Sequence, residues 1–293
     1  METTASRSPV SNYLSLVTFS HTIFALPFAV IGFLLAVKTG QAQFSLKLFL
    51  LVLGCMVTAR SAAMAFNRYI DRDIDAKNQR TAAREIPAGI ITPKNALLFV
   101  ILTSLAFIAC TWFINRLCFY LSPVALAVVL GYSLTKRFTA LCHLVLGIGL
   151  ALAPIGAWLA VTGVFAWLPL FFSFAVLCWV SGFDMIYALQ DEAFDRENKL
   201  NSMPVLLGKK GALRLSEVLH VFAAVFIWLP VYTEGFGWWY RIGAVVFSGL
   251  LIYQHTLVKP DDLSKVNRAF FTTNGIASVV FAVFVILELF FPL

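Results

Sequence analysis

Two short acidic segments carry the residue types in this sequence that are best suited to chemistry. The first reads NRYIDRDID (67–75) and the second reads YALQDEAFD (187–195). In each segment an oxygen-bearing side chain recurs every fourth residue: Asn67, Asp71 and Asp75, then Tyr187, Asp191 and Asp195. On an α-helix this spacing places the three side chains on one face, successive positions about 6 Å apart. Oxygen ligands without His or Cys suit a hard cation such as Mg²⁺, which also binds substrate phosphate oxygens. Two such faces, opposed, describe a clamp for a diphosphate.

Basic residues accompany both acidic segments. Lys136 and Arg137 lie in a short polar loop between apolar runs, and further cations flank the segments: Arg72, Arg84, Arg196 and Lys199. These side chains could meet phosphate charge through charge-assisted hydrogen bonds. The alternative is that they are solvated loop residues that follow the positive-inside rule. The positive-inside rule explains basic residues in the loops, but it does not explain two acidic segments whose carboxylates recur at the same four-residue spacing.

Arg60 is the one cation within an apolar run. A charge within a membrane span costs about 2.5–3.5 kcal/mol on insertion scales and normally faces a partner. Arg60 lies two turns before Asn67 on the same stripe, so it would hold a substrate carboxylate or phosphate below the acidic site, or pair with Asp184. Asp184 in turn lies two turns before Asp191. It would orient a basic partner, help remove a proton, or form a structural pair.

The elements that position these residues are membrane helices. Of the 293 residues, 60% are hydrophobic and 13% charged, against about 45–50% and about 25% in soluble domains, and the mean hydropathy is +0.85. We expect an all-α polytopic membrane protein, one domain over residues 1–293, without a separate aqueous domain. Apolar runs of roughly 20 residues predict nine spans, at about 13–37, 44–66, 95–114, 117–134, 141–163, 166–187, 213–231, 237–257 and 268–292.

The distribution of charge predicts the orientation of these spans. Of the 22 Lys and Arg residues, 17 (Arg7 among them) fall in the N-terminal segment and the even-numbered loops, four lie on the other side, and Arg60 lies within a span. This asymmetry places the N-terminus and both acidic segments in the cytoplasm and the C-terminus outside. Topology thus accounts for the net charge of +7, and no nucleic-acid partner is expected.

The acidic segments also predict an internal repeat. They are 120 residues and four spans apart, and a displacement of four spans preserves both membrane side and helix direction. This is the pattern of a parallel repeat with its site at the repeat interface.

The five cysteines are odd in number and show no CxxC spacing, so neither a disulfide framework nor a zinc site is expected.

At these residues the sequence resembles the UbiA-type superfamily of intramembrane aromatic prenyltransferases, which includes 4-hydroxybenzoate polyprenyltransferase. The family motifs are Asn-Asp-x-x-Asp-x-x-x-Asp and a Tyr-preceded Asp-x-x-x-Asp. Other similar stretches, in family order, are SHTIFALPFA, ARSAAMAFNRYIDRDIDAKN, REIPAG, GYSLTKRFT, LAPIGAWLAVTG and GFDMIYALQDEAFDRENKLNSMPVLLG. From the first to the last they span residues 20–208, most of the chain, while the last two spans match by hydropathy alone.

The resemblance implies a fold and a set of residue roles. The fold is nine transmembrane helices around a central cavity, capped by the loops after spans 2 and 6. Mg²⁺ on the diphosphate would be held by Asn67, Asp71, Asp75, Asp191 and Asp195. The diphosphate would be contacted by Tyr132, Lys136 and Arg137, and Arg60 would lie near the aromatic acceptor.

One position departs from the family pattern, because Arg68 stands where the first motif has Asp. The change resembles a branch with Asn-Arg there, which includes prenylating enzymes of the futalosine route to menaquinone. The acceptor is therefore expected to be 4-hydroxybenzoate or, alternatively, 1,4-dihydroxy-6-naphthoate.

The expected activity is transfer of a polyprenyl group from its diphosphate to an aromatic acid, in a prokaryotic inner or cell membrane. Aromatic rings could stabilise an allylic cation, and a water-free cavity would protect it. The lipid bilayer is the expected surrounding, with no obligate protein partner. Prenylation of glycerol phosphate or haem is a related alternative. A transporter is the alternative from another class, although its ionisable residues would gather near the bilayer midplane.

Overall fold

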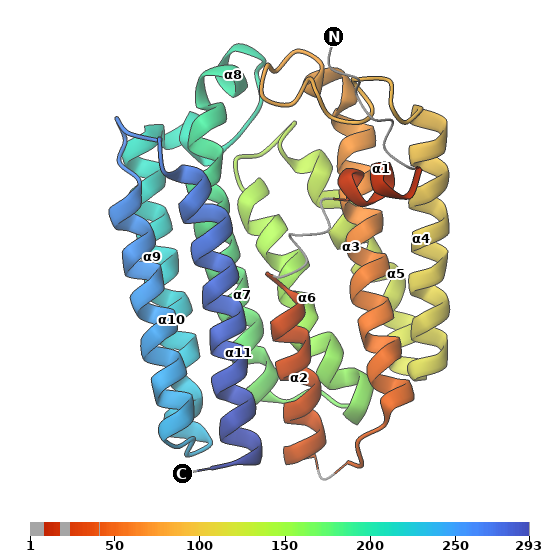
Figure 1. Ribbon diagram of the computed structural model, residues 1–293, viewed down its shortest axis with the longest axis vertical. Coiled ribbons are helices and arrows are strands. Elements are labelled where there is room, and N and C mark those ends of the chain that lie inside the picture. The colour runs from red at the N-terminus through yellow and green to blue at the C-terminus, as the bar shows by residue number, and fades with distance from the viewer. Residues whose placement is uncertain (1–8, 18–23, 41, 293) are drawn as a thin grey trace.

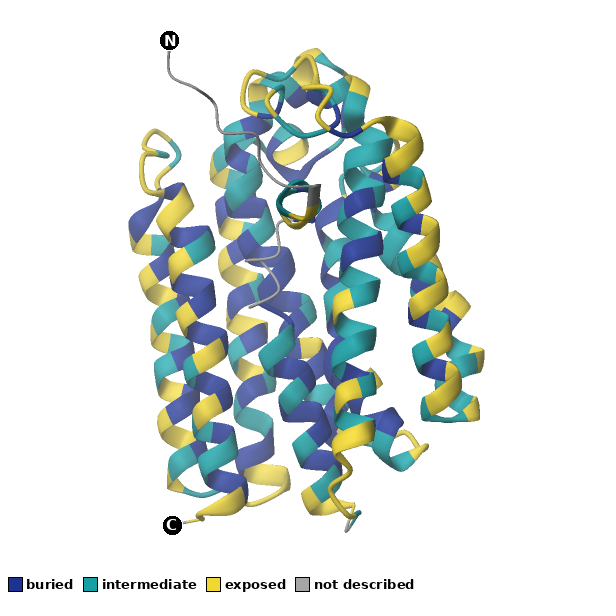
Figure 2. Ribbon diagram, turned by 45° about the vertical axis from the view of Figure 1, so that its right-hand side comes forward, coloured by how far each residue is buried: buried dark blue, intermediate teal, exposed yellow. Residues whose placement is uncertain are grey.

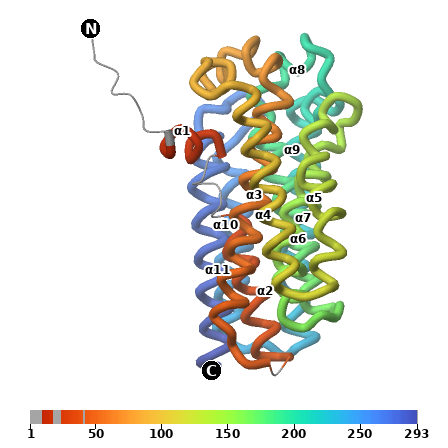
Figure 3. The backbone as a smooth tube through the Cα atoms, turned by 90° about the vertical axis from the view of Figure 1, so that its right-hand side faces the viewer, coloured from red at the N-terminus to blue at the C-terminus, as the bar shows by residue number. Residues whose placement is uncertain are grey.

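The computed structural model is an all-helical bundle, described for residues 9–17, 24–40 and 42–292. The long helices run along the long axis of the molecule, and the short helix α1 (Pro9–Leu16) lies across them (Figures 1 and 3). The helices are α2 (Leu26–Thr39), α3 (Leu46–Asp75), α4 (Pro93–Ile114), α5 (Arg116–Thr135), α6 (Cys142–Thr162), α7 (Trp167–Ala188), η2 (Leu189–Asp191), α8 (Glu192–Glu197), α9 (Met203–Thr233), α10 (Trp238–Leu257), η3 (Arg268–Thr273) and α11 (Asn274–Phe290).

Local sequence signals account for several helix starts. Ser45 accepts a hydrogen bond from the Leu48 amide at 3.3 Å, and Asn115 accepts one from the Cys118 amide at 2.8 Å. Thr92 caps α4 in the same way, with proline following it in the first turn. Each cap satisfies one of the backbone donors that a helix start leaves unpaired. The connections before α3, α4 and α5 therefore end at residues that cap the next helix.

The first predicted span is wrong as a continuous helix. The range 13–37 is divided between α1, which ends at Leu16, and α2, which begins at Leu26 with proline in its first turn. Proline lacks an amide donor and favours the first turn of a helix over its interior, which explains a start there. Residues 18–23 of this range, like Arg7, lie outside the described residues.

The fold is that of an integral membrane protein. Among the described residues, seven helices are long and apolar enough to cross a membrane, α2 is a shorter apolar helix, and α10 is not one of the seven. Among the described residues, the second to ninth predicted ranges each contain one long helix and the first contains α2 and part of α1, so the number of helices that cross the membrane stays a prediction. Buried residues face the bundle interior and exposed ones face outward (Figure 2). Many exposed side chains are large and apolar, for example Leu102, Leu105 and Trp112 on α4, as a bilayer requires.

The buried core lies on one side of the bundle. Aromatic side chains of α2, α7, α10 and α11 pack together around Trp179, which is fully buried and contacts Phe28 and Phe247 at ring distances of 5.5 Å. The indole nitrogen of Trp179 donates to the Asn274 side-chain oxygen at 2.9 Å. Closest packing joins α6 with α7 and α7 with α9, whereas α3, α4 and α5 form the other wall. Both acidic segments end at the same end of this bundle (Figure 1).

Candidate active site at the acidic end of the bundle

The first acidic segment forms the last turns of α3. Asn67 and Asp71 lie on one helix face as expected, and the Asn67 amide donates to Asp71 at 3.0 Å. Asp71 also pairs with Arg137 at 2.9 Å. One turn later Asp75, 5% exposed, pairs with Arg84 at 2.6 Å. The helix ends at Asp75, so the chain turns back and brings the cation nine residues later onto the carboxylate.

The second acidic segment differs from its predicted geometry. Tyr187, Asp191 and Asp195 do not share one continuous helix, because α7 ends at Ala188 and is followed by η2 and then α8. Spacing of four residues cannot reveal such a break, since the local conformation depends on tertiary contacts of the loop. The break directs Asp191 and Asp195 to different cations. Asp191 is 8% exposed and Asp195 is fully buried.

Arg80, from the loop after α3, binds the second segment. Its Nε and Nη2 donate to the two Asp191 oxygens at 3.0 and 2.6 Å, and its Nη1 donates to the Tyr187 hydroxyl at 3.2 Å. Asn78 adds a hydrogen bond to Asp191 at 3.2 Å. Burial by itself would lower the pKa of Arg80, but the hydrogen bond and charge of Asp191 raise it above its usual value. Arg80 therefore stays charged and links the two acidic segments directly.

The loop between α5 and α6 provides a second link. Lys136 pairs with Asp195 at 2.7 Å, while its neighbour Arg137 pairs with Asp71. Arg137 also donates to the Ile70 carbonyl at 2.8 Å. Adjacent residues of one loop thus contact opposite acidic segments. The predicted opposition of the two segments across the end of the bundle is present in the geometry, bridged by cations.

The carboxylates have the donor chemistry for a metal but are not gathered into a metal cluster. Among the described residues, no three or more His, Cys, Asp or Glu side chains lie close enough to hold a metal ion, and each motif carboxylate pairs with a Lys or Arg. However, one oxygen of Asp75 is buried without a hydrogen-bond partner, and the fully buried Asp195 has its ion pair with Lys136. Buried, unpaired carboxylate oxygens are costly and fit a hard cation. The residues present therefore fit Mg²⁺.

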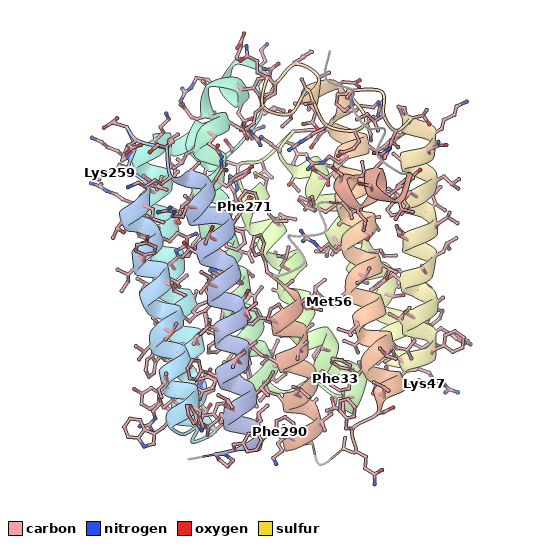
Figure 4. All side chains as sticks on the ribbon, in the orientation of Figure 1. Phe33, Lys47, Met56, Lys259, Phe271 and Phe290 are labelled. Atoms are coloured by element: carbon pink, nitrogen blue, oxygen red, sulfur yellow. The ribbon has the colours of Figure 1, made fainter. Side chains whose placement is uncertain are left out.

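A cavity of about 380 Å³ lies between α2, α3, α4, α5 and α6, below the acidic end. Its walls are mostly small or apolar, and Met56, at mid-height on α3 in Figure 4, is one of them. Arg60, Met64 and Tyr132 also line it. The Arg60 Nε is buried without a hydrogen-bond partner, and within the described ranges Arg60 has no ion pair.

Tyr132 connects the cavity to the acidic end. It lies half-buried on α5, and the charges of Arg68, Arg60 and Asp71 act on it. The order along this wall is therefore Arg60, then Tyr132, then the first carboxylate of the motif. A molecule that reached from the carboxylates into the cavity would pass Tyr132 before meeting Arg60.

Asp184 pairs with a histidine and not with Arg60. The His143 Nδ1 donates to Asp184 at 2.6 Å, and the His143 side chain is 4% exposed. His143 is the second residue of α6, which brings it beside α7. Asp184 thus has a basic partner in the described structure, and that partner lies outside the residues that line the cavity.

Comparison with known proteins decides the family. A sequence profile described as the UbiA prenyltransferase family matches residues 25–276. The chain belongs to this family. Proteins named 4-hydroxybenzoate octaprenyltransferase include one from Tolumonas auensis, 31% identical over 248 residues (84% of this chain, 85% of the relative), and one from Saccharophagus degradans, 32% identical over 235 residues (80% and 78%).

Solved structures of UbiA homologues share the fold. The apo UbiA homologue of Aeropyrum pernix is 33% identical, with a TM-score of 0.83, covering 92% of this chain and 98% of that one. A homologue from Archaeoglobus fulgidus, solved with GPP and Mg²⁺, is 22% identical, with a TM-score of 0.72 over 95% and 99%. The polytopic all-α fold expected from the sequence is confirmed for this UbiA family member.

Sequence reasoning missed three residues of this UbiA site. Arg80 and Asn78 were indistinguishable from other polar residues of the loop after α3, although their position just after the first motif was a signal. His143 was a lone histidine in an apolar run, a pattern more typical of a buried structural residue. Arg68, which departs from the family pattern, lies where Arg84 and Asp75 act on its charge, so this position adds a cation where the family has a carboxylate.

Proposed function

We propose that this prenyltransferase transfers a polyprenyl group from a polyprenyl diphosphate to 4-hydroxybenzoate. The supporting observation is the juxtaposition of two carboxylate motifs with an apolar cavity lined by Arg60. Relatives about 31% identical over most of the chain bear the name of this activity. Residues 1–293 act as one membrane domain.

The metal would be Mg²⁺, held by Asn67, Asp71, Asp75, Asp191 and Asp195 against the donor diphosphate. When bound, it would neutralise charge on the departing diphosphate, an electrostatic effect that is large where water is excluded. The unpaired oxygen of Asp75 supports this assignment.

The basic residues of the site would also bind the diphosphate. Arg80, Lys136 and Arg137 pair with carboxylates in the described structure, and their side chains are 32%, 35% and 40% exposed, so each can turn toward an incoming anion. We assign them to the diphosphate oxygens, where guanidinium and ammonium donors stabilise growing negative charge. Tyr132 adds a hydroxyl donor on the path to the cavity. Asp71 and Asp191 would contribute to catalysis through the Mg²⁺ that they would hold on the departing diphosphate.

Arg60 would bind the acceptor carboxylate. Its planar guanidinium can pair with a carboxylate bidentately and aim the aromatic ring at the first carbon of the donor. The ring carbon ortho to the phenol then attacks the allylic carbon as the diphosphate departs, and the ring loses its proton. The cavity excludes water, which would otherwise quench the allylic cation. Asp184, held by His143, is assigned a positioning role at the edge of this region.

We also propose that the acidic end faces the cytoplasm of a prokaryotic cell, with the N-terminus on the same side. The excess of Lys and Arg in the even-numbered loops supports this orientation. The prenyl tail of the donor would reach the cavity from the bilayer.

A competition assay tests the proposal. Purified protein is given Mg²⁺, one polyprenyl diphosphate and an equal mixture of 4-hydroxybenzoate and 1,4-dihydroxy-6-naphthoate. We expect prenylated 4-hydroxybenzoate as the main product. We expect Arg60→Ala to raise the acceptor KM at least tenfold with a much smaller change in the donor KM. Arg116→Ala, at the other end of α5, is the matched control and should change neither.

Each alternative has its own outcome. Preferential use of the naphthoate would assign the protein to menaquinone synthesis. An unchanged acceptor KM in Arg60→Ala would remove Arg60 from acceptor binding. Absence of prenyl transfer to either acid would refute the proposed reaction.

A further inference from the structure

A second concave surface lies outside the bundle, between α9 and α10. It has a volume of about 660 Å³, within the range of small-molecule sites. Exposed apolar side chains form most of its wall, including Val221, Val225 and Ile252. Its residues belong neither to the acidic site nor to the cavity that contains Arg60. It opens on the side of the bundle where a bilayer would lie.

Polar groups gather at one end of this groove. Glu217 and His220 on α9 and His255 on α10 line the groove at the end of the bundle that carries the acidic motifs. Lys259, just beyond α10, marks this end in Figure 4. From Glu217 to Tyr232 the helix rises about 22 Å, much of the thickness of a bilayer hydrocarbon core. The groove therefore has a polar head and an apolar tail aligned with the expected membrane normal.

The hydrogen bonds at this end define which atom lacks a partner. The His220 Nε2 lies 3.2 Å from the Trp179 carbonyl, which can only accept, so this nitrogen carries a proton. His220 is buried without a bonded carboxylate in the described structure, which favours its neutral form. Its Nδ1 then accepts from the His255 Nε2 at 2.8 Å. The remaining His255 Nδ1 is a buried acceptor without a hydrogen-bond partner.

The charged residues around His255 indicate which hydrogen-bond donor would bind its Nδ1. Glu217 is exposed and close enough for its charge to act on His255. Arg214 lies three residues before Glu217, on the same side of α9, and is also exposed. Neither Arg214 nor Glu217 forms an ion pair in the parts of the chain that the structure describes. A metal is not favoured, because these residues do not form a group that could hold one among the described residues.

We infer that the groove is a binding site for an ethanolamine phospholipid. The ammonium group donates to the His255 Nδ1 and the Glu217 carboxylate, and an acyl chain lies along the groove toward Tyr232. A headgroup with N–H donors fits two adjacent acceptors, whereas a choline headgroup has no N–H to donate and an anionic glycerol headgroup faces the Glu217 charge.

The amount of each lipid that the protein retains tests whether the groove prefers an ethanolamine headgroup. Full-length protein is delipidated in detergent, mixed with DOPE, DOPC or DOPG, and the bound lipid is counted by native mass spectrometry. DOPE and DOPC share their acyl chains and differ in the methylation of the headgroup nitrogen. We expect the wild type to retain one DOPE at least tenfold more tightly than DOPC, the value of about one charge-assisted hydrogen bond.

The variants separate the contacts. Glu217→Gln and His255→Phe should each abolish most of the preference for DOPE over DOPC. Arg214→Gln, one turn beyond the groove, should leave the preference for DOPE unchanged. Glu234→Gln, at the other end of α9, is the matched control and should behave as wild type. Glu217 is exposed, so its variant tests the site even if the buried histidine pair proves essential for folding.

Three results would overturn the inference: equal retention of DOPE and DOPC by the wild type, preference for DOPG, or an unchanged preference for DOPE in Glu217→Gln. Prenyl transfer is assayed in parallel and should remain at the wild-type level in Glu217→Gln. The lipid site and the proposed reaction can therefore fail independently.

Discussion

Arg80 competes with metal for Asp191, and its removal should have opposite effects on the two ligands of the site. The guanidinium binds both Asp191 oxygens, and a metal can use that carboxylate only after Arg80 has left. In Arg80→Ala we therefore expect tighter binding of Mg²⁺ in the absence of diphosphate. We expect a higher donor KM in the same variant, because a cation that would meet the diphosphate is gone.

The size of the effect follows from the geometry. Hydrogen bonds between charged groups contribute about 1.5–3 kcal/mol each, and exposure reduces this through solvent screening. The Arg80 side chain is 32% exposed and that of Asp191 12% exposed, so we take about 1.5–3 kcal/mol for the pair as a whole. A difference of 1.4 kcal/mol is tenfold, so the metal Kd should fall by about 10- to 100-fold. Arg80→Lys keeps the positive charge but lacks the guanidinium that binds both Asp191 oxygens. Its metal Kd should therefore lie between those of the wild type and Arg80→Ala.

Titration with Mn²⁺, followed by its paramagnetic resonance signal and with Mg²⁺ as competitor, measures this affinity on the full-length protein in nanodiscs. Arg116→Ala, far from the acidic end, is the control and should leave the metal Kd unchanged. A metal Kd in Arg80→Ala that equals or exceeds the wild-type value would refute the competition. It would mean that Asp191 is not a metal ligand or that Arg80 does not leave it.

Three further predictions concern the same end of the bundle. Lys136→Met should lower the free energy of unfolding by about 1–3 kcal/mol, because it removes the ion-pair partner of the fully buried Asp195. Adding Asp195→Asn should restore most of the loss; thermal unfolding in detergent measures both variants, and unchanged stability of Lys136→Met would contradict the reasoning. EDTA should abolish prenyl transfer and Mg²⁺ should restore it, so full activity with metal verified absent would exclude the metal. Single cysteines at Ala76 and Glu197, in a cysteine-free background, should both react with an impermeant reagent from the cytoplasmic side only, and labelling from opposite sides would contradict the clamp.

The helices were largely predictable because hydrophobic length is encoded locally. Apolar runs and capping residues locate α4 to α7 and the start of α3 within a few residues of the predicted ranges, while α3 continues beyond its predicted range through the first acidic segment. The first range failed because an apolar run does not reveal where proline begins a new helix. The seventh range began ten residues late, because polar residues such as Lys209 and Lys210 hide the first turns of α9. The parallel repeat and the span count stay predictions.

The site was predictable in its residue types and only partly in its contacts. Carboxylates spaced by four residues could be read as a pair of motifs, since that spacing follows from the sequence. Which cation meets which carboxylate depends on the path of the loops, and sequence spacing does not give the pairing of Arg84 with Asp75 or of Arg80 with Asp191. The partner of Asp184 lies 41 residues earlier, on another helix, and only the packing of α6 against α7 reveals it.

The loop between α5 and α6 is attached unequally to the two halves of the site. Toward the second motif, the Asn201 amide donates to the Lys136 carbonyl at 2.8 Å, and the Cys142 thiol lies 3.6 Å from the Asn201 carbonyl. Toward the first motif, the Arg137 side chain donates to the Ile70 carbonyl and to Asp71. A main-chain bond resists separation more than a long, part-exposed side chain, which can follow a moving partner. The mouth of the site is therefore stiff along one edge and compliant along the other, and any widening to admit a bulky anion costs least beside α3.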